Sequence, residues 1–479
     1  MDFRKIFNYI PEVLKPEEKK LGFNVKLKWT LIILVAFFIL ANISLFGLSS
    51  NALKRFEFLA MILGTQFGSI ISLGVGPIVM ASIILQLLVG SGILGIDTTT
   101  VEGKKFFGGI QKLLILFFII FEALIYVLMQ GLQAAPGFKY LVILQLILGG
   151  LAIYYMSELT EKWGFGSGVS LFIAAGVSWR LITSAFQFVN QQGENCLLNF
   201  GTIPCSGKVL VFFQSIVNRY PWQDLVSPFA AILATVIIFL IVVWAQSLKV
   251  EVPLSYGRLR GYSVKWPLSF FYASVTPVIL TAALVANIQL FGGMLENVAA
   301  PCVSGAACTG ASQFASYFGF LGHFVQGQAI SGLAFWISST NVLELVIRGG
   351  FLPIYLLQGL THILFFVFFS TIFSIFWIKT SGMDAKAQAH KIAASGLQVA
   401  GFRQDERVLE SILDRYIMPL TVMGGIAIGF LASITNLLGA LVSGTAILLV
   451  IMIFFQFYQN IVQQHQMDMA PVMKKFIGG

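Results

Sequence analysis

The feature that most constrains this chain is the recurrence of long apolar runs. Stretches of 18 or more mainly apolar residues, long enough for a membrane-spanning helix, follow one another along its 479 residues. Only 11% of the residues are charged, against about 25% in a soluble domain. As a helix, each run satisfies its own backbone groups in lipid. We therefore predict an all-α polytopic membrane protein. About ten transmembrane helices are expected, at residues 29–48, 70–92, 107–130, 138–158, 167–189, 227–248, 267–291, 353–378, 416–438 and 440–463.

Charge and span number predict the orientation and the division of the chain. Most of the 30 Lys and Arg residues fall on one side if the N-terminus is cytoplasmic, as the positive-inside rule expects. Ten spans would return the C-terminus to that side. Two pseudo-symmetric halves of five spans would be inverted relative to each other around a central path. The predicted divisions are an arm at 1–28, a half at 29–190, an external segment at 191–226, a half at 227–464 and a cytoplasmic tail at 465–479.

The region around the second span is the most irregular. Gly74, Gly76 and Pro77 crowd its start, and proline removes a backbone donor while glycine permits unusual dihedrals, so a break or a helix start is expected there. The segment at 50–66 carries charged residues that are costly in hydrocarbon. It should therefore line a water-filled cavity or the outer surface, and an ordinary outer loop is the alternative.

The four cysteines fall in two segments that this topology places outside. Disulfides persist on oxidising faces, so we predict pairs between Cys196 and Cys205 and between Cys302 and Cys308. Free, buried cysteines are the alternative. No histidine lies nearby at ligand spacing, and no metal site is predicted.

Signatures of catalysis are missing from the sequence, which contains no HExxH, GxSxG, kinase or Walker A motif. We predict neither an enzyme nor a cofactor. Glu122 and Asn287 are polar outliers within predicted spans, either functional or simply hydrogen-bonded between helices. His362 in the eighth span is expected to be a packed or hydrogen-bonding residue rather than a proton relay. An inverted-repeat transporter for a small solute remains an alternative, although such transporters need more ionisable groups at the midplane. An intramembrane enzyme would need paired catalytic residues at that depth.

Two predicted cytoplasmic segments are basic. Arg258, Arg260 and Arg403 each lie next to or near glycine, which would place them on tight turns. Topology alone explains cytoplasmic arginines. The functional alternative is a docking surface for a polyanionic partner, because Lys and Arg clusters bind phosphate backbones.

Two long motifs carry a resemblance to a known family. SIISLGVGPIVMASIILQLL at 69–88 and YMSELTEKWGFGSGVSLFIAAGVS at 155–178 are similar to the SecY family, the central subunit of the Sec protein-conducting channel, in its archaeal form and its eukaryotic alpha counterpart. Further matches extend over nearly the whole chain and weaken at 190–226 and 292–350. The resemblance implies a channel that passes nascent or unfolded polypeptides across the membrane and releases hydrophobic segments into lipid.

The resemblance also implies roles for individual residues. Residues 50–66 would be a plug. The lateral gate would include Met80, Glu122 and Asn287, and methionine at 80 departs from the small hydroxyl residue common in the family. Arg258, Arg260 and Arg403 would contact the ribosome. A pore ring would consist of Val75, Val79, Val169, Ile173, Ile279 and Leu449. Core packing is the alternative for each ring residue.

Partners and location follow from the same resemblance. We expect SecE-like (gamma) and beta-type small membrane subunits, the ribosome, signal sequences with nascent chains, and membrane lipid. The expected location is the plasma membrane of an archaeon-like cell, or the endoplasmic reticulum if the chain is eukaryotic, with both termini cytoplasmic.

Overall fold

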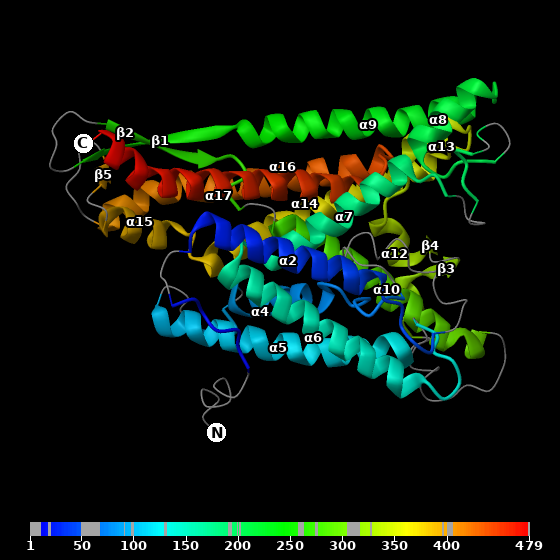
Figure 1. Cartoon of the computed structure of the whole chain (residues 1–479), viewed down its shortest axis with the longest axis horizontal. Helices are drawn as coiled ribbons and strands as arrows, with labels where there is room; N and C mark the ends of the chain where they lie inside the picture. The colour runs from blue at the N-terminus through cyan, green and yellow to red at the C-terminus, as the bar shows by residue number, and fades with distance from the viewer. Residues whose placement is uncertain are drawn as a thin grey trace.

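The structure is a computed structural model of the chain, shown in Figure 1. Residues 11–17, called the arm below, are the first part that it describes. The described residues are 11–17, 21–48, 68–90, 92–96, 100–128, 132–189, 194–198, 200, 203–256, 263–273, 276–303, 317–325, 328–394, 397–399 and 406–477.

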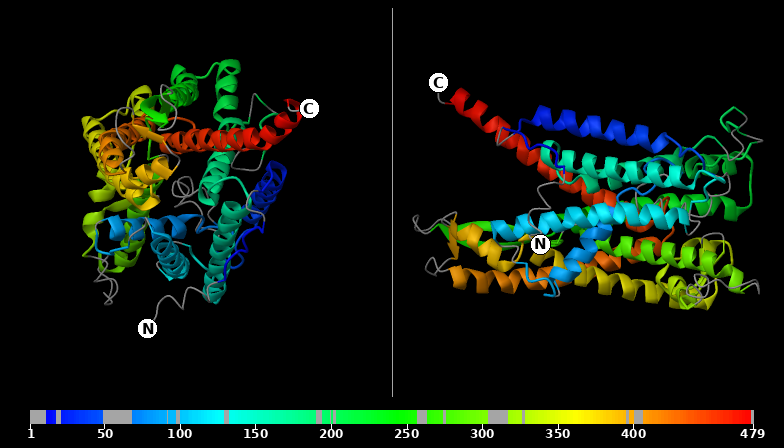
Figure 2. Two further views of the ribbon diagram at one scale, coloured as in Figure 1. Left: turned by 90° about the vertical axis from the view of Figure 1, so that its left-hand side faces the viewer. Right: turned by 90° about the horizontal axis from the view of Figure 1, so that it is seen from below.

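Long helices lying side by side make up most of the molecule (Figures 1 and 2). In the described part, nine are long and apolar enough to cross a membrane. A further apolar helix, α4, is shorter. The long helices and α4 are α2 (Phe23–Asn42), α4 (Gly76–Gly90), α5 (Val101–Leu128), α6 (Lys139–Trp163), α7 (Gly168–Phe186), α9 (Trp222–Ser247), α10 (Thr276–Val303), α14 (Pro353–Ser381), α16 (Glu406–Leu437) and α17 (Gly444–Ile477). The chain is thus a multi-pass membrane protein, as the apolar runs predict.

The helices form two groups that follow the chain. In the first, α6 packs against α2, α5 and α7, and α5 packs against α4. In the second, α14 packs against α10 and α16, while α17 packs against α9 and α16. The groups meet where α4 contacts α10 and α14, and where α7 contacts α17.

The α14–α16 pair lies close because glycines face the neighbouring backbone. A Cβ added to Gly425 would lie 2.9 Å from Thr371 Cα, and one added to Gly429 would lie 2.8 Å from the Phe366 carbonyl oxygen. This spacing of small residues lets two membrane helices approach each other closely.

One end of the bundle, called the sheet end, carries a small sheet in the strand order β2-β1-β5. Its second hydrophobic core includes Val252, Leu268, Ala389 and Leu413. The Tyr272 hydroxyl donates to the Met383 carbonyl oxygen at 2.8 Å, which ties the residues before α10 to those after α14. The elements at this end are β1 (Lys249–Tyr256), β2 (Ser263–Ser269), α15 (Ala385–Ala394) and β5 (Leu397–Val399).

The opposite end, called the hairpin end, carries short elements (Figure 1). Helix α12 packs against α10 and α14, and α8 packs against α7 and α9. The elements are α8 (Lys208–Val217), η2 (Gly319–Leu321), β3 (His323–Val325), β4 (Gln328–Ser331), α12 (Gly332–Ile337) and α13 (Val342–Ile347).

Several boundaries differ from the sequence-based prediction. The seventh span was expected from residue 267, but residues up to Ser269 belong to β2 and α10 begins at Thr276. The residues between β2 and α10 include Phe271, Tyr272 and Ala273, which are apolar and buried in the protein, so hydropathy alone merges them and the end of β2 with the span. The second span is helical only from Gly76, with Pro77 in its first turn, where a missing donor costs little. Helix α2 begins at Phe23, within the predicted arm.

Candidate functional site

A cavity of about 1210 Å³ lies among helices of both groups. Its charged lining comes from the arm, α5 and α6, and its polar lining includes Ser82 and Gln86 of α4. Its aliphatic lining includes Val79, Val169 and Ile279, from α4, α7 and α10. A pocket of this size exceeds the roughly 300–1,000 Å³ of ordinary small-ligand sites. The cavity is therefore suited to something larger than a small solute.

The six residues of the predicted pore ring belong to one hydrophobic cluster. Val75 precedes α4 and its carbonyl oxygen accepts from the Val79 amide at 3.0 Å, which places the two residues one helical turn apart. Five of the six are buried and Val169 is partly buried. The elements that carry them, α4, α7, α10 and α17, are also elements through which the two helix groups meet.

The turn before α4 is pinned to neighbouring chain segments. Leu45 N–H donates to the Gly68 carbonyl oxygen at 2.7 Å, and Ile70 N–H donates to the Ile43 carbonyl oxygen at 2.9 Å. A Cβ added to Gly149 of α6 would lie 1.9 Å from the Ile70 carbonyl oxygen, so only glycine permits this approach. The predicted plug, 50–66, lies outside the described residues.

The three predicted gate residues lie on three different helices. Met80 of α4 is partly buried against the main cluster. Asn287 of α10 is buried and its Nδ2 donates within its own helix, to the Ala283 carbonyl oxygen at 2.8 Å. Glu122 of α5 is buried, and its Oε1 has no hydrogen-bond partner in the described part of the chain. The seam between the groups is instead packed closely at Gly90 of α4, which faces the Phe376 ring of α14.

The predicted ribosome-contacting arginines, Arg258, Arg260 and Arg403, lie outside the described residues. The strands beside them are described: Leu254 of β1 pairs with Val399 of β5. The chain therefore leaves one sheet at Tyr256 before Arg258 and Arg260, and at Val399 before Arg403.

Cys196 and Cys205 form a disulfide with Cα atoms 5.3 Å apart. The loop between them is folded around Gln214 of α8, whose Nε2 donates to the Phe200 and Ile203 carbonyl oxygens at 2.8 and 2.7 Å. Its Oε1 accepts from Cys205 N–H at 3.0 Å. The side chains of the second predicted pair, Cys302 and Cys308, lie outside the described part.

The sequence did not predict two polar contacts near the cavity. Gln111 Nε2 of α5 donates to Ser82 Oγ of α4 at 3.0 Å. Lys112 beside it pairs with Glu158 of α6 at 3.2 Å. The only sequence signal was the spacing of Glu158 and Lys162, which are four residues apart and therefore on one helix face.

Comparisons with known proteins agree with this geometry. A model of the SecY family matches residues 69–458. A protein translocase subunit SecY from Methanothermobacter thermautotrophicus is 39% identical, covering 99% of this chain and 98% of the relative. One from Methanocaldococcus jannaschii is 36% identical, covering 98% of each. A solved protein-conducting channel is 34% identical with a TM-score of 0.79, covering 98% of this chain and 99% of that one. Sec61 from a canine ribosome–channel complex is 33% identical with a TM-score of 0.76, with the same coverage.

Proposed function

Because this chain belongs to the SecY family, we propose that it forms the channel of a protein translocase. It passes nascent or unfolded polypeptides across the membrane and releases hydrophobic segments sideways into lipid. The activity is transport without covalent chemistry, and the chain is not an enzyme. The relatives reported above are translocase and channel subunits, so the small-solute transporter is set aside.

The observation that carries this proposal is the aliphatic cluster between the two helix groups. Val75, Val79, Ile173, Ile279 and Leu449 are buried together, where four elements from both groups converge beside a large cavity. Branched apolar side chains around a constriction exclude water and therefore ions. They also offer a passing polypeptide no polar group to hold it. We assign these five residues and Val169 to the pore ring.

The gate follows from the same packing. We propose that the chain opens laterally where α4 meets α10 and α14, with Met80, Glu122 and Asn287 along the opening. The helices there are in contact through close packing, such as that of Gly90 against Phe376. Helices held by such packing separate more readily than helices joined by hydrogen bonds or ion pairs. Residues 50–66 are proposed as the plug, supported by the hydrogen bonds that pin the chain on both sides of that segment.

We further propose that the sheet end faces the cytoplasm and that both termini lie there, in the plasma membrane of an archaeon. Archaeal relatives of similar length support this location. SecE-like and beta-type subunits, as well as the ribosome, are the proposed partners. The ribosome would bind Arg258, Arg260 and Arg403, which follow β1 and β5 in the sequence. Ribosome binding that is unchanged when these arginines become glutamate would contradict that assignment.

Ion conductance tests the channel and its ring together. The complex is reconstituted in vesicles, and Val79→Gly and Ile279→Gly variants are compared with wild type. Each glycine removes a branched side chain from the constriction, so resting conductance should rise about ten-fold. Leu233→Gly, an exposed residue of α9, serves as the control and should leave conductance unchanged. Equal conductance in all four proteins would reject the ring assignment.

A further inference from the structure

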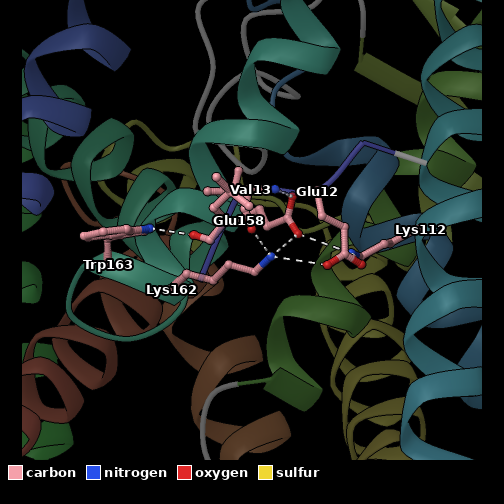
Figure 3. Close-up of polar contacts among 7 residues, drawn as sticks. Glu12, Val13, Lys112, Glu158, Lys162 and Trp163 are labelled. Carbon is pink, nitrogen blue, oxygen red and sulfur yellow. Dashed lines mark hydrogen bonds and ion pairs between the residues drawn. The ribbon is translucent and has the colours of Figure 1, made fainter. Parts of the chain in front are cut away.

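The arm is held against the sheet end of the bundle by its backbone. Val13 N–H donates to Glu158 Oε2 at 3.3 Å, and the Val13 carbonyl oxygen accepts from Lys162 Nζ at 2.6 Å. The Leu14 carbonyl oxygen accepts from Trp163 Nε1 at 2.9 Å. Figure 3 shows these contacts converging on the end of α6. The arm is extended here and has no helix of its own, so α6 side chains supply the partners that a strand or helix would otherwise provide.

Four charged side chains close a ring around this contact. Lys112 pairs with Glu12 and with Glu158, the latter at 3.2 Å. Lys162 pairs with the same two carboxylates, at 3.5 Å to Glu12 and 2.8 Å to Glu158. Opposite charges therefore alternate around the ring, and its net charge is zero. We call these four residues the charge ring; they come from the arm, α5 and α6.

The members of the charge ring differ in exposure. The Glu158 side chain is 8% exposed and that of Lys162 is 14% exposed, whereas Glu12 is 51% exposed. A nearly buried carboxylate depends on its partners to remain charged. Glu158, bonded to α5, α6 and the arm, is therefore the residue that joins the three elements, and Glu12 is the contact most open to water.

The charge ring is continuous with a helix of the constriction. Gln111, next to Lys112, donates to Ser82 Oγ of α4. Ser82 in turn bonds to the Ile78 carbonyl oxygen at 2.9 Å, the residue before Val79. The charge-ring residues and Val79 also line the same cavity. Because Gln111 and Lys112 are neighbours in α5, these hydrogen bonds and ion pairs link the arm, through α5, to the helix that carries the ring residue Val79.

We propose that the arm and the charge ring form a strap that ties α5 to α6 and, through Gln111, to α4. The three helices then move as one body, and lateral opening has to displace all of them rather than α5 alone. Glu158 is a positioning residue for this movement. The strap raises the threshold for opening, so that only a strongly apolar signal segment opens the gate. This inference rests on the proposed function, and it identifies the charge ring as the contact that regulates opening of the channel.

The test is selectivity between signals. The full chain with its small subunits, in vesicles with ribosomes that translate the reporters, transports a reporter with a strong signal and the same reporter with a shortened apolar stretch. The measured quantity is the ratio of weak-signal to strong-signal transport. Glu158→Gln keeps the side-chain volume and removes the charge, so the ratio should rise about five-fold. Glu161→Gln is the matched control: this exposed carboxylate lines the same cavity one turn away, and its ratio should equal that of wild type.

Two further variants separate positioning from general damage. Lys112→Gln should raise the ratio as Glu158→Gln does, while Lys112→Arg retains the charge and should restore the wild-type ratio. The Glu158→Gln, Lys112→Gln double variant should show no more than the larger single effect, because both break the same ring. Glu12→Gln, on the exposed side of the ring, should raise the ratio about two-fold, and the variant should still fold.

The outcomes distinguish the two proposals. If wild-type vesicles transport neither reporter, the proposed function fails. If they transport the strong-signal reporter but Glu158→Gln and Glu161→Gln give the same ratio, the strap alone is wrong. A raised ratio in Lys112→Arg equal to that in Lys112→Gln would also overturn the strap, because the charge would then be irrelevant.

Discussion

The two ends of the bundle are held by polar networks of opposite character. At the sheet end, the charge ring joins the arm to α5 and α6 through ion pairs. At the hairpin end, uncharged side chains of α14 donate hydrogen bonds to the last carbonyl oxygens of α12. The Phe335, Trp336 and Ile337 carbonyl oxygens accept, in that order, from Gln358 Nε2 at 2.8 Å, Thr361 Oγ1 at 2.8 Å and His362 Nδ1 at 2.6 Å. The last carbonyls of a helix have no partner within it, and these side chains supply one.

The uncharged network extends to the helix that carries Leu449. Asn436 Nδ2 of α16 lies 3.3 Å from His362 Nε2, and Asn436 Oδ1 accepts from Thr445 N–H at 2.8 Å at the start of α17. His362 therefore donates from Nδ1 and accepts at Nε2, which defines a neutral ring. This is the hydrogen-bonding role expected for it from the sequence.

The difference predicts which end can move. The charge ring is open to water at Glu12, so water and ions can replace the contacts of that carboxylate when the arm leaves. The uncharged network is buried, and a lost member leaves a donor or acceptor unpaired. We infer that the hairpin end is the fixed frame of the channel and the sheet end is the adjustable one.

The largest effect is expected from breaking the fixed frame. His362→Ala leaves the Ile337 carbonyl oxygen and Asn436 without their partner and opens a void, so the free energy of unfolding should fall by about 2–4 kcal/mol. His323→Ala is the control, since this residue is exposed and pairs with Glu296 at the surface, and should cost less than about 1 kcal/mol. Unfolding by detergent titration measures both. Equal losses would contradict the assignment of the frame to the buried network.

A smaller effect is expected from the disulfide at the hairpin end. The Cys196→Ala, Cys205→Ala variant frees a loop closed across nine positions, which should lower the free energy of unfolding by about 2–3 kcal/mol on loop entropy alone. Gln214 still holds the loop backbone through three hydrogen bonds, so the folded loop should persist. Proteolysis within 196–205 reports on this. Rapid cleavage of the variant in its folded state would show that the disulfide, not Gln214, maintains the loop.

The sequence predicted what depends on local chemistry. Each helix must satisfy its own backbone hydrogen bonds in lipid, so one apolar run predicts its approximate position. Pro77 predicts the interruption before α4. The end of β2 and the buried residues after it, among them Phe271 and Tyr272, were assigned to a span because burial in protein and burial in lipid select the same residue types. The charge ring could not be predicted from the sequence, because Lys112 and Glu158 lie 46 positions apart and Glu12 and Lys112 lie 100 positions apart. No periodicity connects such partners, and only the packing of α5 on α6 brings them together.

The smallest expected effect concerns acid and the adjustable end. The hydrogen bond from Lys112 holds the pKa of Glu12 below its ordinary value of 4.5, with the charges of Lys112 and Lys162 acting in the same direction. A lowered pKa means that the contact stabilises the fold above pH 4.5 and that this contribution is lost as the pH falls through the lowered pKa. Glu12 is half exposed, so the contribution should stay below about 1 kcal/mol. The stability difference between wild type and Glu12→Gln should be constant from about pH 6 to 8 and shrink below pH 4.5. A difference that grew on acidification would place the stabilising form of Glu12 in its protonated state, and the charge ring would no longer explain how the arm is held.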